Sequence, residues 1–365
     1  MPILTQRSLI VATLAIILLN VCLLLNRERN SACYLNPAFS NCQVYNNTSF
    51  VAPKLGPNNE KLAFAMFFSS TEDQSEDLAV DNYFISARML VWQLLHSPKT
   101  RNRRHIDVVV IVTPSVSQSR CALLEADGAI IHPIEFLPKQ WGDFRETRWI
   151  DILAKLRGWE MTQYSRIAML DTDTVLREPI DHIFDEEAAQ FQVLLPYADV
   201  ERKPPEGAPP LPEKYVLAGV GETFSSEHPF PPWWDGDGTN GGLYKRGYFN
   251  GGFLVFAPNK QLFDHFMFKV NLPDSFDPSL AEQNLLNSVH NWHGPAPWKP
   301  LNSTWNLMYP NDDDLKGGLK TMHQKWFEVP WADGQNNGEL VKAEMLRVRW
   351  EMEGWYEAVE EKGST

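Results

Sequence analysis

Two carboxylates one residue apart follow a short apolar run and could bind a metal ion. The run Ile167-Ala-Met-Leu170 leads directly into Asp171-Thr-Asp173. In an extended segment the side chains of residues i and i+2 point to the same side, so both carboxylates can face one cation. Hard divalent cations take oxygen ligands and often keep phosphate oxygens in their remaining positions. The pattern therefore predicts a metal and nucleotide site centred on Asp171 and Asp173.

A second Asp-x-Asp tripeptide, Asp235-Gly-Asp237, is the alternative for this role. It lies in a glycine-rich stretch that no apolar strand precedes. Ligands of open α/β sheets sit beyond the carboxyl ends of strands. We therefore favour Asp171 and Asp173.

The elements that must position these carboxylates alternate between strand and helix. Continuous apolar runs are typical of strands that are buried on both faces, and apolar residues at helical spacing separate them. Strands are expected at 62–68, 107–113, 129–134 and 167–170, and helices at 83–96, 117–126 and 150–164. This order predicts an α/β fold with a mostly parallel central sheet and right-handed connections.

The second half of the chain is less regular. Residues 199–247 are rich in Pro and Gly, and we expect a long irregular insertion there. Periodicity returns with a Gly-Gly turn into a strand at 248–256, followed by helices at 259–270 and 279–289. The regular pattern ends after Phe191-Gln-Val-Leu-Leu195, and a charged helical tail covers 339–360.

The composition excludes some partners and site types. The 365 residues are 44% hydrophobic, which is ample for a large core, and the net charge is −13. An acidic chain without long basic runs argues against a nucleic-acid partner. The four cysteines show no Cys-x-x-Cys spacing, which argues against a zinc site. A Cys33–Cys42 disulfide is an open alternative, provided that this stretch faces an oxidising compartment.

The N-terminal residues predict a membrane anchor. An apolar run at 9–25 lies between Arg7 and Arg27, after a short cytosolic tail at 1–8. We interpret the run as a transmembrane signal anchor, with a cleaved signal peptide as the alternative. Residues 26–60 are rich in Asn, Ser and Pro and indicate a stem.

Glycosylation sequons suggest on which side of the membrane the body lies. Two overlap at Asn46-Asn-Thr48 and Asn47-Thr-Ser49, and a third is Asn302-Ser-Thr304. We therefore expect a single-pass type II protein of the Golgi or ER membrane. Its lumenal side would hold a globular domain at 61–338 and the helical tail at 339–365.

Several blocks at matching spacing resemble one enzyme family. Residues 154–185 closely resemble the central block of glycogenin-like enzymes, glycosyltransferase family 8. Two further stretches are similar to family blocks, namely Phe249-Asn-Gly-Gly-Phe-Leu-Val-Phe256 and Glu282-Gln-Asn-Leu-Leu-Asn287. His323, followed by Pro330-Trp331, resembles the family's final segment. The resemblance covers roughly residues 61–331.

This resemblance implies a GT-A fold, a Rossmann-like domain that binds a UDP-sugar and a divalent cation, usually manganese. It also implies retention at the anomeric carbon. Asp171 and Asp173 would bind the metal, and His323 would supply a third protein ligand. A cation that bridges the diphosphate oxygens stabilises the leaving group as a Lewis acid.

The resemblance also assigns donor contacts. Lys155 would contact the sugar or nucleotide end of the donor, and Tyr83 would lie against the uracil ring. Asn250 and Gly251 would shape the pocket beside the transferred sugar. The insertion at 199–247 has no counterpart in the family, and its residues 233–238, with Trp233 and Trp234, could form part of an acceptor site.

Catalytic roles go to the pair Glu282 and Gln283, on the sugar face opposite the leaving group, and to Asp173 through the metal. An amide is a poor nucleophile, which favours front-side transfer with Gln283 supporting charge at the anomeric centre. Glu282 stays a candidate carboxylate.

The chain departs from the family pattern near its end. Trp326 and Val329 stand where the family has a Gly and a Lys, and Lys325 could replace that lysine from a shifted position. The expected reaction is transfer of a hexose or N-acetylhexosamine from a UDP-sugar to a glycan, glycoprotein or other hydroxyl acceptor. The alternatives are a non-catalytic sugar- or nucleotide-binding relative and a metal-dependent phosphoesterase or nucleotidyltransferase.

Overall fold

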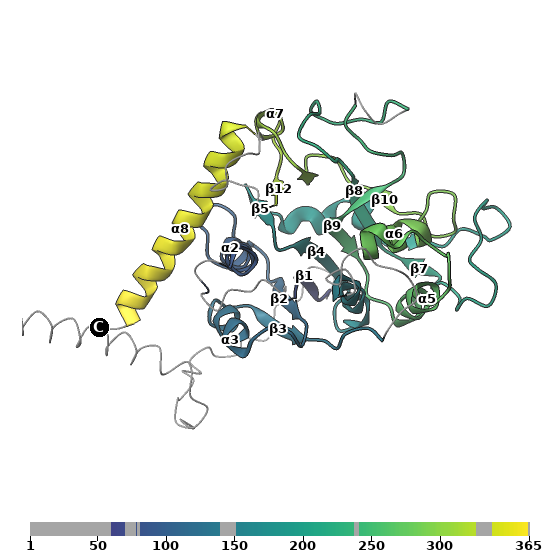
Figure 1. Cartoon of the computed structure of the whole chain (residues 1–365), viewed down its shortest axis with the longest axis horizontal. Coiled ribbons are helices and arrows are strands. Elements are labelled where there is room, and N and C mark those ends of the chain that lie inside the picture. Colours follow the sequence, from purple (N-terminus) through teal and green to yellow (C-terminus); the bar gives the residue numbers. More distant parts are fainter. Residues whose placement is uncertain are drawn as a thin grey trace, which may run out of the picture. The chain divides into compact units, whose positions relative to one another are not determined.

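A computed structural model (Figure 1) describes residues 60–69, 78, 81–138, 151–236, 241–325 and 338–363. All of them belong to one compact unit, residues 53–365. The expected cytosolic tail, the anchor at 9–25, nearly all of the stem and the Cys33–Cys42 pair lie outside the described residues. Among the helices of the described ranges, none combines the length and the apolar character that a membrane crossing needs.

A seven-stranded sheet forms the centre of the fold, in the order β10-β8-β9-β4-β1-β2-β3. Its strands are β1 Leu62–Phe68, β2 Asp107–Val112, β3 Ile130–Pro133, β4 Arg166–Asp171, β8 Leu217–Gly221, β9 Phe249–Phe256 and β10 Lys299–Pro300. Strand β9 runs antiparallel to both of its neighbours, and the other pairings are parallel. The sheet is therefore mixed but mostly parallel, which confirms the predicted α/β class.

The apolar runs of the strands are buried on both faces of the sheet. In β1, Phe64 and Met66 pack into one core, whereas Ala63 and Ala65 pack into a second core on the opposite face. This alternation follows from the two-residue period of a strand. The candidate carboxylate Asp171 stands at the carboxyl end of β4, beyond these buried residues.

Helices cover both faces (Figure 1). The helices are α2 Asn82–Leu95, α3 Gln118–Ala126, α5 Lys260–Val270, α6 Ala281–Val289, α7 Asp312–Lys316 and α8 Glu339–Gly363, with 3₁₀ helices η1 Leu153–Glu160, η2 Asp181–Asp185, η3 Glu187–Ala189 and η4 Pro278–Leu280. Residues of α2, α3 and α8 pack into the first core, and residues of η1, α5 and α6 pack into the second.

The C-terminal helix is part of the first core and not an appended tail. Val341, Met345, Val348 and Met352 of α8 are buried in that core. Their spacing places them on one face of a helix. The predicted helix at 339–360 is thus confirmed, with an apolar face that packs beside α2.

The prediction of a regular helix at 150–164 is wrong in part. Residues 151 and 152 are helical, but 153–160 form the 3₁₀ helix η1. Gly158 lies so close to the sheet that an added Cβ would be 2.7 Å from Met169 and 3.2 Å from Phe256. The neighbouring Trp159 stacks on Phe256 with ring centroids 3.8 Å apart. Packing against β4 and β9 therefore sets the local backbone.

The prediction of an irregular insertion at 199–247 is wrong for residues 214–221. This stretch contains β7 Lys214–Tyr215 and strand β8 of the central sheet. In β8, Gly219 approaches β9 closely, because an added Cβ would be 3.0 Å from Leu254. Because β8 contains small residues that permit this packing, its sequence shows no continuous apolar run that would predict a strand. Strand β7 pairs with β6 Gln192–Val193 in a two-stranded sheet outside the central one.

A three-stranded sheet beside the central one has the order β11-β12-β5. It consists of β5 Thr174–Leu176, β11 Leu307–Met308 and β12 Thr321–His323. Strand β12 runs antiparallel to β5, with His323 opposite Thr174. This pairing brings His323 close to the carboxyl end of β4.

Candidate metal and donor site

The candidate metal ligands meet because two strand ends meet. Asp171 ends β4, and Asp173 lies in the turn that leads into β5. The antiparallel pairing of β12 with β5 places His323 beside this turn. Beyond β12 the backbone N–H of Gln324 donates to the carbonyl oxygen of Asp173 at 3.1 Å. Residues about 150 positions apart are thus held in one corner.

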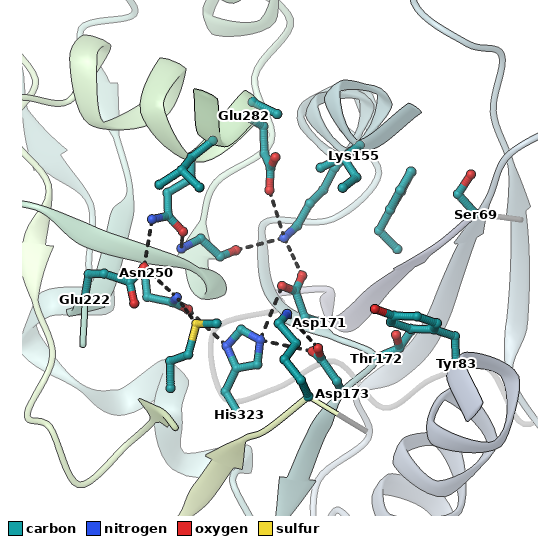
Figure 2. A pocket seen from close by; sticks show the side chains of 18 of the residues that line it. Ser69, Tyr83, Lys155, Asp171, Thr172, Asp173, Glu222, Asn250, Glu282 and His323 are labelled. Carbon is teal, nitrogen blue, oxygen red and sulfur yellow. Dashed lines mark hydrogen bonds and ion pairs between the residues drawn. The ribbon is translucent and has the colours of Figure 1, made fainter. Parts of the chain in front are cut away.

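The three side chains have the geometry of a metal site (Figure 2). One ligand atom from each of Asp171, Asp173 and His323 lies within 4.8 Å of the others. The Nε2 atom of His323 is 3.0 Å from Oδ1 of Asp173 and 3.7 Å from Oδ2 of Asp171.

Two of these atoms are buried without a hydrogen-bond partner in the described part of the chain, namely Asp173 Oδ1 and His323 Nε2. Buried polar atoms normally have partners, and a cation between these atoms would supply one. One imidazole and two carboxylates are an acceptable ligand set for manganese. The residues present therefore fit the expected ion.

Asn250 fixes the orientation of His323. Its Oδ1 atom lies 3.2 Å from Nδ1 of His323 and also accepts from the backbone N–H of Gly252 at 2.8 Å. Its Nδ2 group donates to Oε2 of Glu222 at 2.9 Å. Because these partners assign the amide oxygen to the histidine side, the ring proton lies on Nδ1. The lone pair of Nε2 then faces the carboxylates, as a ligand needs.

The predicted Gly-Gly turn is wrong, because both glycines lie inside the buried strand β9. A Cβ on Gly252 would lie 2.2 Å from Cε1 and 2.5 Å from Nδ1 of His323. The glycine is required here because the imidazole ring lies directly against the backbone.

Lys155 is buried between three acceptors. Its Nζ atom donates to Oδ1 of Asp171 at 2.5 Å, to the carbonyl of Gly251 at 2.8 Å and to Oε1 of Glu282 at 3.5 Å. Burial alone would lower the pKa of Lys155, but the carboxylates of Asp171 and Glu282 raise it. This lysine therefore stays charged. It links α6 to the metal corner, the name used below for Asp171, Asp173 and His323.

Lys325 pairs with the second aspartate. Its Nζ atom donates to Oδ2 of Asp173 at 2.8 Å. Burial would raise the pKa of Asp173, but the Lys325 ammonium and the His323 ring beside it hold that pKa far below its usual range. Asp173 is therefore an anion, ready to bind a cation.

Gln283 and Glu282 stand at the start of α6. The Oε1 atom of Gln283 accepts from the N–H of Gly251 at 2.6 Å, and its Nε2 group donates to Oε2 of Glu222 at 2.8 Å and to the hydroxyl of Tyr248 at 3.1 Å. Both ends of this amide are thus fixed. Burial raises the pKa of Glu282 to about 7, with Asp171 adding to the rise and Lys155 opposing it.

The backbone before this pair is strained. Ala281 has φ 41° and ψ −120°, a conformation that L-residues rarely adopt. Strain of this kind persists where the surroundings over-determine it, and it clusters at functional sites.

One cavity of about 440 Å³ joins these groups. The predicted site residues that line it are Tyr83, Lys155, Asp171, Asp173, Asn250, Gly251, Glu282, Gln283, His323 and Lys325. In Figure 2, Tyr83 and Ser69 lie on one side of the metal corner, and Glu222 and Asn250 lie on the other. The cavity thus has two ends with the metal corner between them. The individual roles of these residues stay predictions.

Sequence reasoning missed Glu222, which lines the cavity and holds both Asn250 and Gln283. A signal was present, because Glu222 directly follows a buried strand just as Asp171 ends one. Burial raises the pKa of this carboxyl group.

Other predicted residues lie elsewhere. Trp233 and Trp234 are exposed and, like Asp235, do not line the cavity. The carboxylate of Asp235 accepts from the N–H of Gly241 at 3.1 Å. Residues 326–337, with the departures Trp326 and Val329, lie outside the described residues, as does Asp237.

Comparisons with known proteins are consistent with this site. No family model matches the chain. The chain is 27% identical over 308 residues to an uncharacterized protein of Schizosaccharomyces pombe, and the match covers 77% of each. It is 25% identical over 296 residues to galactinol synthase 10 of Arabidopsis thaliana, and this match covers 75% of this chain and 80% of that protein. Galactinol synthase 2 of Solanum lycopersicum is 27% identical over 257 residues, with 67% and 69% covered.

Among solved structures, the glycosyltransferase GlyE of Streptococcus pneumoniae aligns with a TM-score of 0.47 at 12% identity. The alignment covers 82% of this chain and 64% of that one. A similarity of this size carries no argument by itself, so the assignment rests on the sequences and on the residues of the site. Both agree with the resemblance of the chain to glycosyltransferase family 8 and its GT-A fold.

Proposed function

We propose that the protein transfers a hexose or N-acetylhexosamine from a UDP-sugar to a hydroxyl group of a glycan, glycoprotein or other acceptor, with retention at the anomeric carbon. One observation carries the proposal. The candidate metal ligands Asp171, Asp173 and His323 line the same cavity as the fixed amide of Gln283.

The cavity can separate the two ends of such a donor. Tyr83 would lie against the uracil ring at one end, and Asn250, Gly251 and Gln283 would surround the sugar at the other. The diphosphate would then lie at the corner formed by Asp171, Asp173 and His323. A Mn²⁺ ion held there would stabilise the leaving diphosphate as a Lewis acid.

The hydrogen bonds of α6 support front-side transfer. Gln283 is neutral and fixed at both ends of its amide by Gly251 and Glu222. Glu282 is held 3.5 Å from the Lys155 ammonium. Neither is free to act as an unpaired nucleophile in this arrangement. Gln283 would instead orient its dipole toward the charge that develops at the anomeric centre.

We further propose a place in the secretory pathway, with the body on the lumenal side of the Golgi or ER membrane. The apolar run at 9–25 and the sequons support this. Asn302, the first residue of the third sequon, is exposed, so an oligosaccharide could be attached there.

The reaction is tested by UDP release from a panel of UDP-glucose, UDP-N-acetylglucosamine, UDP-galactose and UDP-xylose, with and without Mn²⁺. We expect Mn²⁺-dependent release of UDP from one of these donors. A folded protein that binds UDP but releases it from no donor would be a non-catalytic relative. Release of phosphate or diphosphate in place of UDP would indicate a phosphoesterase or nucleotidyltransferase.

A further inference from the structure

Asp173 divides its two carboxylate oxygens between different partners. Oδ1 faces Nε2 of His323 at 3.0 Å, on the side where a cation fits. Oδ2 accepts from the Nζ atom of Lys325 at 2.8 Å. A lysine ammonium therefore neutralises this candidate metal ligand.

The two lysines of the site are held very differently. Lys155 has three acceptors, and its side chain is 4% exposed. Lys325 has one acceptor within the described part of the chain, and its side chain is 24% exposed at the cavity wall. Lys155 is therefore anchored, whereas Lys325 can move by breaking a single ion pair.

The backbone keeps Lys325 at the metal corner wherever its side chain points. The chain leaves β12 after His323, and the N–H of Gln324 is bonded to the carbonyl of Asp173. In an extended segment, residues i and i+2 project to the same side, so Lys325 follows His323 toward the cavity. A diphosphate whose oxygens complete the coordination of a cation would come within reach of this ammonium.

We propose that Lys325 is an exchangeable counter-ion, which pairs with Asp173 until a donor binds and moves to the donor's diphosphate when cation and nucleotide bind together. The inference rests on the proposed function, since it takes a nucleoside diphosphate as the ligand. Lys325 then competes with a free cation but favours the cation–nucleotide pair. The protein would thus bind Mn²⁺ weakly by itself and more tightly with UDP, a coupling that is reciprocal between the two ligands.

The test measures Mn²⁺ binding without nucleotide and UDP binding at saturating Mn²⁺, both by titration calorimetry. Lys325→Met should bind Mn²⁺ alone about threefold more tightly or better, because the competing charge is gone. The same variant should bind UDP about tenfold more weakly, because a charge-assisted hydrogen bond to phosphate is lost.

Two control variants separate charge from side-chain length. Lys325→Arg keeps the charge and should retain UDP binding near the wild-type level. Lys316→Met removes an exposed lysine that pairs with Asp313 on α7, and it should change neither affinity. Thermal unfolding adds a second readout. Without metal, Asp173 has lost its counter-ion in Lys325→Met, so Mn²⁺ should raise the melting temperature of this variant more than that of the wild type.

The outcomes distinguish the exchange from the function on which it rests. Unchanged or weaker binding of Mn²⁺ alone by folded Lys325→Met would overturn the exchange, and so would unchanged binding of UDP. A wild-type protein that binds Mn²⁺ but no UDP would overturn the proposed function, and the exchange with it.

Discussion

Replacing Gly252 by Ala tests whether the strand β9 positions His323, the histidine of the candidate metal site. The added Cβ would lie 2.2 Å from Cε1 of His323 and 2.9 Å from Oδ1 of Asn250, whereas ordinary contacts begin at 3.4 Å. In a close-packed interior the ring must therefore retreat by about 1 Å. We expect Mn²⁺ affinity to fall by about 10–100-fold, as when a ligand loses its supporting contacts. Overpacking should also reduce the free energy of unfolding by about 1–3 kcal/mol.

Two other glycines serve as matched controls for this substitution. Gly354 in α8 has open space around the added Cβ, and Gly354→Ala should leave Mn²⁺ binding unchanged while raising helix stability by up to about 1 kcal/mol. On Gly251 the added Cβ would meet Cβ and Oε1 of Gln283 at 3.2 Å, so Gly251→Ala should lower turnover more than Mn²⁺ affinity. Calorimetric titration of the folded proteins gives the affinities. Wild-type Mn²⁺ affinity in folded Gly252→Ala would refute the reasoning.

Three further predictions concern α6 and the surface. Gln283→Ala should lower turnover by about 100-fold while Mn²⁺ affinity stays within about twofold, since the amide would act at the sugar and not at the metal; equal losses in both would contradict this. The free energy of unfolding of the metal-free protein should fall as pH rises from 4.5 to about 7. In this range the folded protein keeps a proton on Glu282 that the unfolded chain releases, so a higher pH favours unfolding. Urea titrations at several pH values give the free energy of unfolding, and its decrease over this pH range should be smaller in Glu282→Gln than in the wild type. The same pH dependence in both proteins would argue against the prediction. Asn302→Gln should remove one glycan from protein made in the secretory pathway, seen as a mobility shift that a glycosidase abolishes in the wild type.

The local part of the site could be predicted from the sequence. Asp171 and Asp173 follow an apolar strand, and the two-residue period of an extended segment predicts that both side chains point to one side. His323 is far away in the sequence, and it came from the resemblance of its surrounding block to a known family. Its approach to Asp173 depends on the pairing of β12 with β5, and no local pattern reports that pairing.

Tertiary packing accounts for what the sequence did not predict. Strand β8 is short and contains two glycines, so the sequence predicts an irregular Pro- and Gly-rich insertion there and no strand that would place Glu222 at its end. The turn expected at Gly251 and Gly252 is a strand, because the glycines make room for His323 and not for a reversal of the chain. The three acceptors of Lys155 come from three separate elements, and only the folded chain brings them together.

The most direct test of the account compares two aspartates from the two Asp-x-Asp tripeptides. Mn²⁺-dependent release of UDP from the preferred UDP-sugar is measured for the wild type, Asp173→Asn and Asp235→Asn, each shown to be folded by circular dichroism. Asp173→Asn should lose at least about 100-fold of the Mn²⁺-dependent rate, because a metal ligand is removed. Asp235→Asn should keep the wild-type rate. Unchanged turnover in Asp173→Asn would contradict the assignment of the metal site and the mechanism built on it.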